Sequence, residues 1–259
     1  MKLKCLSKDY LTVKIYPDRT EMGRNAAKEI KQKIVELLQS KDTLNMIFAA
    51  APSQNEVLEA LVNDSDILWD KINAFHMDEY IGLSADAPQG FGNFLRRSLF
   101  SRVPFKSVQY IDCTAKNSEK EAERYATLLK EYPADIVVMG IGENGHIAFN
   151  DPDVADFNDE KAVKVVKLDE ICRNQQVNDG CFSKIDDVPT HAITLTVPTL
   201  MAATWAFCIV PAKTKAKAVE ATVNGEISEK CPASILRTKQ NAVLYLDNDS
   251  SNLLQEVEQ

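Results

Sequence analysis

The sequence predicts an α/β fold, a three-layer sandwich with a mostly parallel central sheet. Short apolar runs typical of buried strands alternate with helical patterns along most of the chain. One of these runs, Ile136 to Met139, ends in closely spaced glycines, as strands of parallel sheets often do before a ligand-binding turn. The 259 residues contain no internal repeat, linker or low-complexity segment, so we expect a single domain over 1–259.

The elements of the N-terminal half follow from apolar periodicity and capping residues. Residues 1–19 are expected to form an N-terminal extension and an edge strand, with the strand at Leu11 to Tyr16. Asp18 or Thr20 caps a helix that runs to about Gln39. The next elements are expected to be a strand at Leu44–Phe48, a loop at Ala49–Gln54, a helix at Asn55–Val62, a strand at Ile72–His76, a helix at Gly90–Leu99 and a strand at Val108–Ile111.

In the C-terminal half the same patterns continue. Ser118 is expected to cap a helix to about Glu131, with Glu121 in the capping-box position. The segment 169–189 is polar and rich in turn formers, so it could form a mobile flap. The remaining elements are expected to be strands at Ile136–Met139, Ala162–Val166, Ala192–Val197, Thr204–Val210 and Ala242–Leu246, and a helix at Thr214–Val223.

Composition and charge exclude several classes of function. A net charge of −8 argues against a nucleic-acid partner, and no apolar stretch is long enough to span a membrane. The six cysteines form no C-x-x-C pair, and together with the lack of a signal peptide this indicates reduced thiols in the cytoplasm. The three histidines and scattered thiols show no metal-ligand spacing, so we expect no metal and no cofactor. A homo-oligomer is compatible with the sequence.

Two strand ends carry the side chains that point to chemistry. Asp78 and Glu79 follow the strand at Ile72–His76, and His146 and Asp151 follow the glycine loop. In open α/β sheets, ligands bind beyond the carboxyl ends of the strands. We therefore expect these groups to meet in an acid–base site.

The glycine loop itself is expected to lie against the ligand. Gly142 and Gly145 permit a tight turn and a close approach of the backbone to a substrate. The bland interpretation of this loop alone is an ordinary turn with a surface histidine, but the second motif makes a site the better interpretation.

These motifs resemble the glucosamine-6-phosphate deaminase/isomerase family. The resemblance rests on Phe75–Tyr80 and Gly140–Pro152, continues through Lys213–Val219 and Pro232–Ser234, and covers roughly Thr20 to Leu246. It implies a Rossmann-like three-layer fold. It also implies conversion of a phosphorylated amino sugar, glucosamine or galactosamine 6-phosphate, to the ketose 6-phosphate and ammonia without a metal.

The resemblance also implies roles for single residues. Asp78 would be the base that moves a proton between carbons 2 and 1. His146 would assist ring opening, oriented by Asp151, where the family usually has Glu. Asn144 stands where the family often has Asp.

The phosphate site departs most from the family pattern. The family has a Gly-Gly-Thr-Pro type turn where this chain has Ala50-Ala51-Pro52-Ser53-Gln54. Of that turn, only the hydroxyl group is retained, at Ser53, and Gln54 follows it. Lys215 is retained in the other phosphate-binding position. The arginine expected from the flap has no clean match: Gln176 aligns best, and Arg173 lies one helical turn earlier.

Other interpretations stay open. A 6-phosphogluconolactonase-type hydrolase of the same superfamily carries a similar glycine–histidine loop but lacks the Met-Asp-Glu-Tyr motif. A non-catalytic sugar-phosphate sensor ranks last. His76 is expected to be a packed strand-end residue, and Glu79 is compatible with a purely structural place at a helix N-terminus. Lys213 and Lys217 are expected to be solvated.

Overall fold

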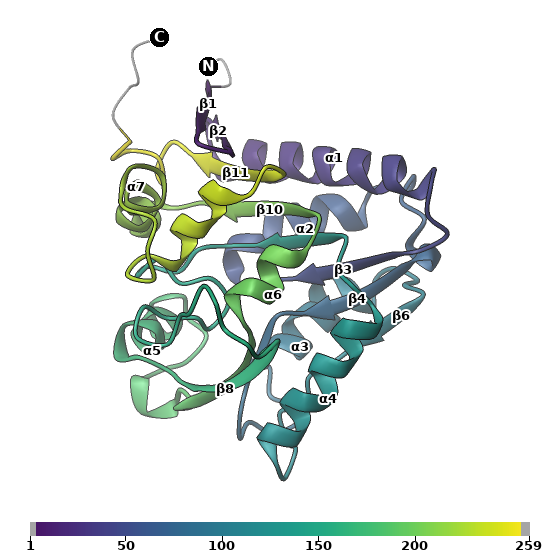
Figure 1. Ribbon diagram of the computed structural model, residues 1–259, viewed down its shortest axis with the longest axis vertical. Coiled ribbons are helices and arrows are strands. Elements are labelled where there is room, and N and C mark those ends of the chain that lie inside the picture. The colour runs from purple at the N-terminus through teal and green to yellow at the C-terminus, as the bar shows by residue number, and fades with distance from the viewer. Residues whose placement is uncertain (1–3, 255–259) are drawn as a thin grey trace.

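The computed structural model describes residues 4–254 and shows an eight-stranded sheet between two layers of helices (Figure 1). All strand pairs in this sheet are parallel except the antiparallel pair at one edge, β1–β2. In spatial order the strands are β1 (Lys4–Lys8), β2 (Leu11–Tyr16), β11 (Ala242–Asp247), β10 (Trp205–Val210), β7 (Ile136–Met139), β3 (Leu44–Phe48), β4 (Ile72–His76) and β6 (Ser107–Gln109).

Strand β7 shows why the sheet needs helices on both faces. Ile136 and Val138 pack into one apolar core with α1, α2 and α3, whereas Val137 and Met139 pack into a second core with α4, α6 and α7. Successive side chains of a strand point to opposite faces, so a continuous apolar run requires burial on both. The helices are α1 (Arg19–Leu38), α2 (Asn55–Val62), α3 (Phe91–Leu95), which continues as a π-helical turn over Arg96–Phe100, α4 (Ser118–Glu131), α5 (Glu170–Asn178), α6 (Val197–Ala202) and α7 (Ala216–Asn224).

Most expected elements are confirmed. The bounds of β3, α2, β4 and β7 match the sequence predictions, and Asp18 caps α1 by accepting a hydrogen bond from the Glu21 amide. The segment 169–189, expected only as a flap, contains helix α5, which is capped by Asp169. Whether this segment moves stays a prediction.

Three expectations are wrong. Leu11–Tyr16 is not the edge strand, because the polar strand β1 pairs outside it. The α4 cap is Asn117 rather than Ser118, and the carboxylate of Glu121 binds the Asp112 amide and Arg124 instead of closing a capping box. Val197 does not end a strand but begins α6, because Pro198 suits the first turn of a helix.

A second, antiparallel sheet was not expected from the sequence. It consists of β5 (Asp78–Tyr80), β9 (His191–Leu195) and β8 (Val163–Lys167), in that order. Its strand β5 starts two residues after β4 ends, so Asp78 is held by backbone pairing with Thr194 at the end of the main sheet. This small sheet therefore fixes the position of the acidic motif.

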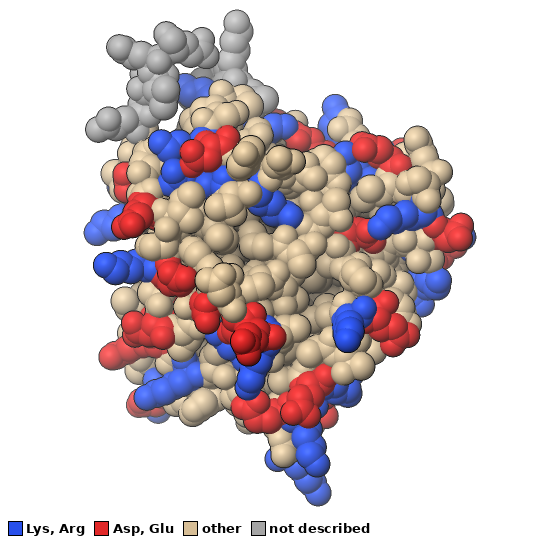
Figure 2. Space-filling model, in the orientation of Figure 1, with Lys and Arg blue, Asp and Glu red and all other residues tan. Residues whose placement is uncertain are grey.

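Figure 2 shows the charged side chains on one face of the molecule. Basic and acidic side chains of both signs are interspersed there, mainly around the periphery. All six cysteines are free. Within residues 4–254, no helix is long and apolar enough to cross a membrane.

Candidate active site

A cleft lies at the carboxyl ends of the parallel strands, on the side where α5 and α7 lie in Figure 1. Segments that directly follow four strands line it: 49–54 after β3, 77–78 after β4, 140–149 after β7 and 211–215 after β10. Helix α5 contributes a further wall. The expectation that the two chemical motifs meet at one sheet edge is confirmed, because Asp78 and His146 line this same cleft.

The glycine loop holds His146 by close backbone contact. The amide of Gly142 donates to the carbonyl of His146 over 2.9 Å, and a Cβ placed at Gly142 would overlap the imidazole ring. Gly145 has φ +86°, and a Cβ there would lie 2.8 Å from Cys231 Sγ. Both glycines therefore serve the shape of this loop, as expected from the sequence, but Gly142 lines the cleft whereas Gly145 packs against Cys231.

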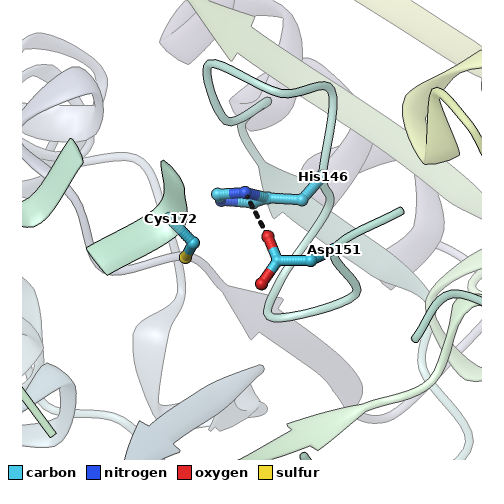
Figure 3. A group of neighbouring side chains, drawn as sticks. All are labelled: His146, Asp151 and Cys172. Carbon is cyan, nitrogen blue, oxygen red and sulfur yellow. Dashed lines mark ion pairs between the residues drawn. The ribbon is translucent and has the colours of Figure 1, made fainter. Parts of the chain in front are cut away.

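A hydrogen-bond network fixes the imidazole of His146. Its Nδ1 lies 2.7 Å from Asn144 Oδ1 and 3.0 Å from Asp151 Oδ1, the contact dashed in Figure 3. Asn144 Nδ2 donates to the carboxylates of Asp151 and Asp169, so its oxygen must be the atom that faces the ring. Both neighbours of Nδ1 are acceptors, and we therefore assign the proton to Nδ1 and the free lone pair to Nε2.

Asp151 is a buried, ionised partner in this network. Burial alone would raise its pKa, but hydrogen bonds from His146, Asn144 and the Asp169 amide outweigh burial and lower the pKa of Asp151. The carboxylate therefore stays charged and orients the ring without taking its proton.

Cys172 joins this group from α5 and was missed by sequence reasoning. Its thiol faces Asp151 and His146 in Figure 3, and ligand atoms of the three residues lie within 4.8 Å of one another. Such a set could hold a soft metal ion in principle. Burial and the nearby carboxylates raise the pKa of the Cys172 thiol well above its usual range, so the thiol keeps its proton and hydrogen-bonds to Asp151, which also accepts from His146 Nδ1.

Asp78 is the acid that faces the cleft without a partner. It is 6% exposed, and no group in residues 4–254 donates a hydrogen bond to its carboxyl oxygens. Burial, and then the negative charge of Glu79, raise the pKa of Asp78 well above its usual range. A buried carboxylate that lacks donors is poised to take a proton.

Glu79 and His76, close to Asp78 in sequence, form hydrogen bonds within the protein that stabilise the fold. The carboxylate of Glu79 accepts from the amides of Tyr80, Phe91 and Gly92, which ties β5 to the first turn of α3. The His76 ring contacts the Asp78 carbonyl through Nδ1 and accepts from the Ile111 amide at Nε2. Burial lowers the pKa of His76 to about 4, so it stays neutral as a packed strand-end residue.

The loop after β3 presents a hydroxyl donor to the cleft. Gln54 Nε2 donates to Ser53 Oγ over 3.1 Å and to the Ile209 carbonyl over 3.2 Å. The carbonyl contact fixes the orientation of the amide, since a carbonyl can only accept. Because Ser53 Oγ accepts here, its own proton is available for a ligand. The Gln54 Oε1 atom is buried without a partner among the described residues.

Lys215 is a buried cation at the opposite wall. It is 6% exposed, and its ammonium has no ion pair or hydrogen bond with residues 4–254. Burial lowers the pKa of Lys215, and the charges of Asp179 and Glu143 offset this in part. A desolvated ammonium without a partner is typical of a site for an anion.

The two flap residues have different surroundings in the structure. Gln176 lines the cleft, but Arg173 does not, because its guanidinium donates to the carbonyls of Ile185 and Val188. The structure therefore places the Arg173 side chain away from the cleft, against the end of the flap. Gln175 and Asp179 also line the cleft and were not predicted from the sequence. The signal was present: Asp169 is an N-cap residue, and in the helix that it starts, Cys172, Gln175 and Asp179 have the spacing of one helix face.

Arg19, in the first turn of α1, also lines the cleft and was missed. Nothing in its local sequence distinguishes it from a solvated helix residue. It reaches the cleft because α1 begins beside the loop after β3, where Arg19 binds the Pro52 carbonyl over 3.0 Å.

Comparison with known proteins gives a consistent assignment. The sequence model of the glucosamine-6-phosphate isomerases/6-phosphogluconolactonase family matches residues 17–245. A glucosamine-6-phosphate deaminase of Listeria innocua is 33% identical over 232 residues, which are 90% of this chain and 95% of the relative. One from Streptococcus sanguinis is 33% identical over 237 residues, 92% and 96% of the two chains.

Solved structures agree. That of a monomeric glucosamine-6-phosphate deaminase matches with a TM-score of 0.84 at 27% identity, over 93% of this chain and 99% of that one. The 6-phosphogluconolactonase of Thermotoga maritima matches with a TM-score of 0.74 at 21% identity, over 92% and 99%. The second similarity concerns the fold alone.

Proposed function

This chain belongs to the family of glucosamine-6-phosphate isomerases and 6-phosphogluconolactonases, and on that premise we propose that it deaminates a hexosamine 6-phosphate. The substrate would be glucosamine 6-phosphate or its galactose epimer. The products are the ketose 6-phosphate and ammonia, and one water is consumed. The observation that carries the proposal is the buried, unpartnered carboxyl group of Asp78 in the same cleft as His146.

The first step is ring opening, in which His146 serves. With Nδ1 protonated, Nε2 can accept the proton of the anomeric hydroxyl and return it to the ring oxygen as the carbon–oxygen bond breaks. Asp151 and Asn144 keep this tautomer throughout, because both accept from Nδ1. The ring is thus a proton carrier of fixed orientation.

The second step is the proton shift, in which Asp78 serves. Its carboxylate takes the hydrogen on carbon 2 of the open chain while the ammonium group on carbon 2 gives one proton to the carbonyl oxygen, which yields a neutral enolamine. The Asp78 carboxyl group then delivers its proton to carbon 1. The resulting iminium at carbon 2 is hydrolysed by water to the ketose and ammonia. Desolvation makes Asp78 a stronger base than an exposed carboxylate, and its freedom from donors lets it face both carbons.

The phosphate is proposed to bind at the far end of the cleft. Lys215 supplies charge, and Ser53 supplies a hydroxyl proton directed by Gln54. Gly140 connects the two ends, since Ser53 and Gln54 lie against it and Gly142 supports His146 two residues later.

The test is ammonia release measured across phosphorylated hexosamines, with Asp78→Asn as the matched inactive control. We expect release from at least one hexosamine 6-phosphate and loss of release in the variant. 6-Phosphogluconolactone is the comparison substrate, because its hydrolysis needs no proton shift at carbon. A wild-type protein that hydrolyses this lactone and releases no ammonia from any hexosamine phosphate would contradict the proposal.

A further inference from the structure

The described part of the cleft presents two basic side chains, Lys215 and Arg19. The flap helix supplies none: its cleft-lining residues are Gln175, Gln176 and Asp179. A phosphate monoester dianion needs more than one positively charged donor in a partly buried site. The cation that the family resemblance expects from the flap must therefore come from elsewhere.

Arg19 is held in a fixed orientation beside the loop after β3. Its Nη2 donates to Glu56 Oε2 over 2.8 Å and to the Pro52 carbonyl over 3.0 Å, and its Nε lies 2.7 Å from Glu56 Oε1 as an ion pair without hydrogen-bond geometry. Glu56 lies in the first turn of α2, so the Arg19 guanidinium and its carboxylate partner are both attached to helices. The remaining nitrogen, Nη1, has no partner within residues 4–254, and the side chain is 41% exposed.

We infer that Arg19 is the second cation of the phosphate subsite and donates from Nη1 to the phosphate across from Lys215. This inference rests on the proposed function and deepens it. Arg19, in the first turn of α1, would take the place of the phosphate-binding arginine that the resemblance expects from the flap. Because Arg19 and Lys215 both lie outside 169–189, the phosphate would be bound whatever the position of the flap helix.

The competing explanation is that Arg19 only clamps α1 to α2 through Glu56. The two explanations differ for Glu56→Gln. This variant breaks the ion pair but leaves the guanidinium in place, and glutamine can still accept one hydrogen bond. A clamp would fail equally in Arg19→Gln and Glu56→Gln, whereas a phosphate ligand is lost only in Arg19→Gln.

The experiment is calorimetric titration of the whole protein with inorganic phosphate, alongside KM for glucosamine 6-phosphate. We expect Arg19→Gln to weaken phosphate binding by about tenfold to a hundredfold, as for a lost hydrogen bond to a charged group. Glu56→Gln should bind phosphate at least as well as the wild type. The control Arg24→Gln, on the same helix and paired with Glu21, should bind as the wild type does.

Unchanged phosphate affinity in Arg19→Gln would overturn the inference, as would equal weakening in Arg19→Gln and Glu56→Gln or no phosphate binding by the wild type. The titration needs no turnover. A loss of affinity confined to Arg19→Gln would therefore support the inference even if no hexosamine phosphate were deaminated.

Discussion

Gly142 allows the imidazole of His146 to lie directly on the glycine loop, and one added methyl group tests this contact. A Cβ at Gly142 would overlap three ring atoms of His146. The φ angle of Gly142 is not in the left-handed region, so alanine fits the backbone and the overlap can be relieved only by moving the ring. Carbon contacts need about 3.5 Å, which demands a shift of more than about 1 Å. Such a shift breaks the Nδ1 contacts of 2.7 and 3.0 Å to Asn144 and Asp151.

We therefore expect Gly142→Ala to lower kcat about a hundredfold, the cost of misplacing a catalytic group by about 1 Å. The assay is the initial rate of ammonia release, with the thermal midpoint as a check of folding. Gly82→Ala is the control: its φ of +91° makes alanine strained, but no atom lies within 4 Å of the added Cβ. That variant should lose stability and keep its kcat. A folded Gly142→Ala protein with wild-type kcat would refute the reasoning.

Four further substitutions at three positions give predictions, and those at Asp78 and Lys215 lower function while they raise stability. Asp78→Asn should lose at least about a hundredfold in kcat. Burial raises the pKa of Asp78, so the wild-type fold loses stability as pH rises from about 4 through the folded-state pKa. The thermal midpoint of Asp78→Asn should therefore exceed that of the wild type at pH 8. Below about pH 4 the two midpoints should be equal, because Asp78 is then protonated in both the folded and the unfolded state. Lys215→Met should raise KM for the phosphorylated substrate more than for the unphosphorylated sugar. Burial lowers the pKa of Lys215, so the buried ammonium destabilises the wild-type fold as pH falls below about 10.5. The thermal midpoint of Lys215→Met should therefore exceed that of the wild type at pH 7. Asp151→Glu should fold and retain activity within about tenfold, whereas Asp151→Asn should lose far more, because it removes the charge that orients His146; equal rates for the two variants would contradict the orienting role.

The central strands could be predicted because their sequence signals are local. The strands at Leu44–Phe48 and Ile136–Met139 are apolar runs with clear ends, and both were assigned with the bounds that the structure has. By contrast, β1 is a mostly exposed, polar strand that exists because β2 offers it a partner, and no window of its own sequence shows this. The three-residue strand β5 likewise depends on β9.

The chemical half of the site could be predicted, because strand-end motifs place Asp78 and His146 at one edge of a parallel sheet. The phosphate half could be predicted only in part. Arg173 is followed along the chain by the cleft residues Gln175 and Gln176, and the direction of each side chain depends on how α5 lies over the cleft. Arg19 is remote in sequence from every motif, and only the packing of α1 against the loop after β3 brings it to the site.

The fate of the hydrogen on carbon 2 tests the central claim most directly. Glucosamine 6-phosphate carrying deuterium at carbon 2 is incubated with the protein, and the ketose product and ammonia are measured together with the label at carbon 1. If Asp78 shuttles the proton on one face of the substrate, ketose and ammonia form in equal amounts and part of the deuterium appears at carbon 1, with the remainder lost to water from the carboxyl group. Ammonia and ketose formed with no deuterium at carbon 1 would contradict transfer by a single shielded carboxylate, and a protein that forms neither product would contradict the account as a whole.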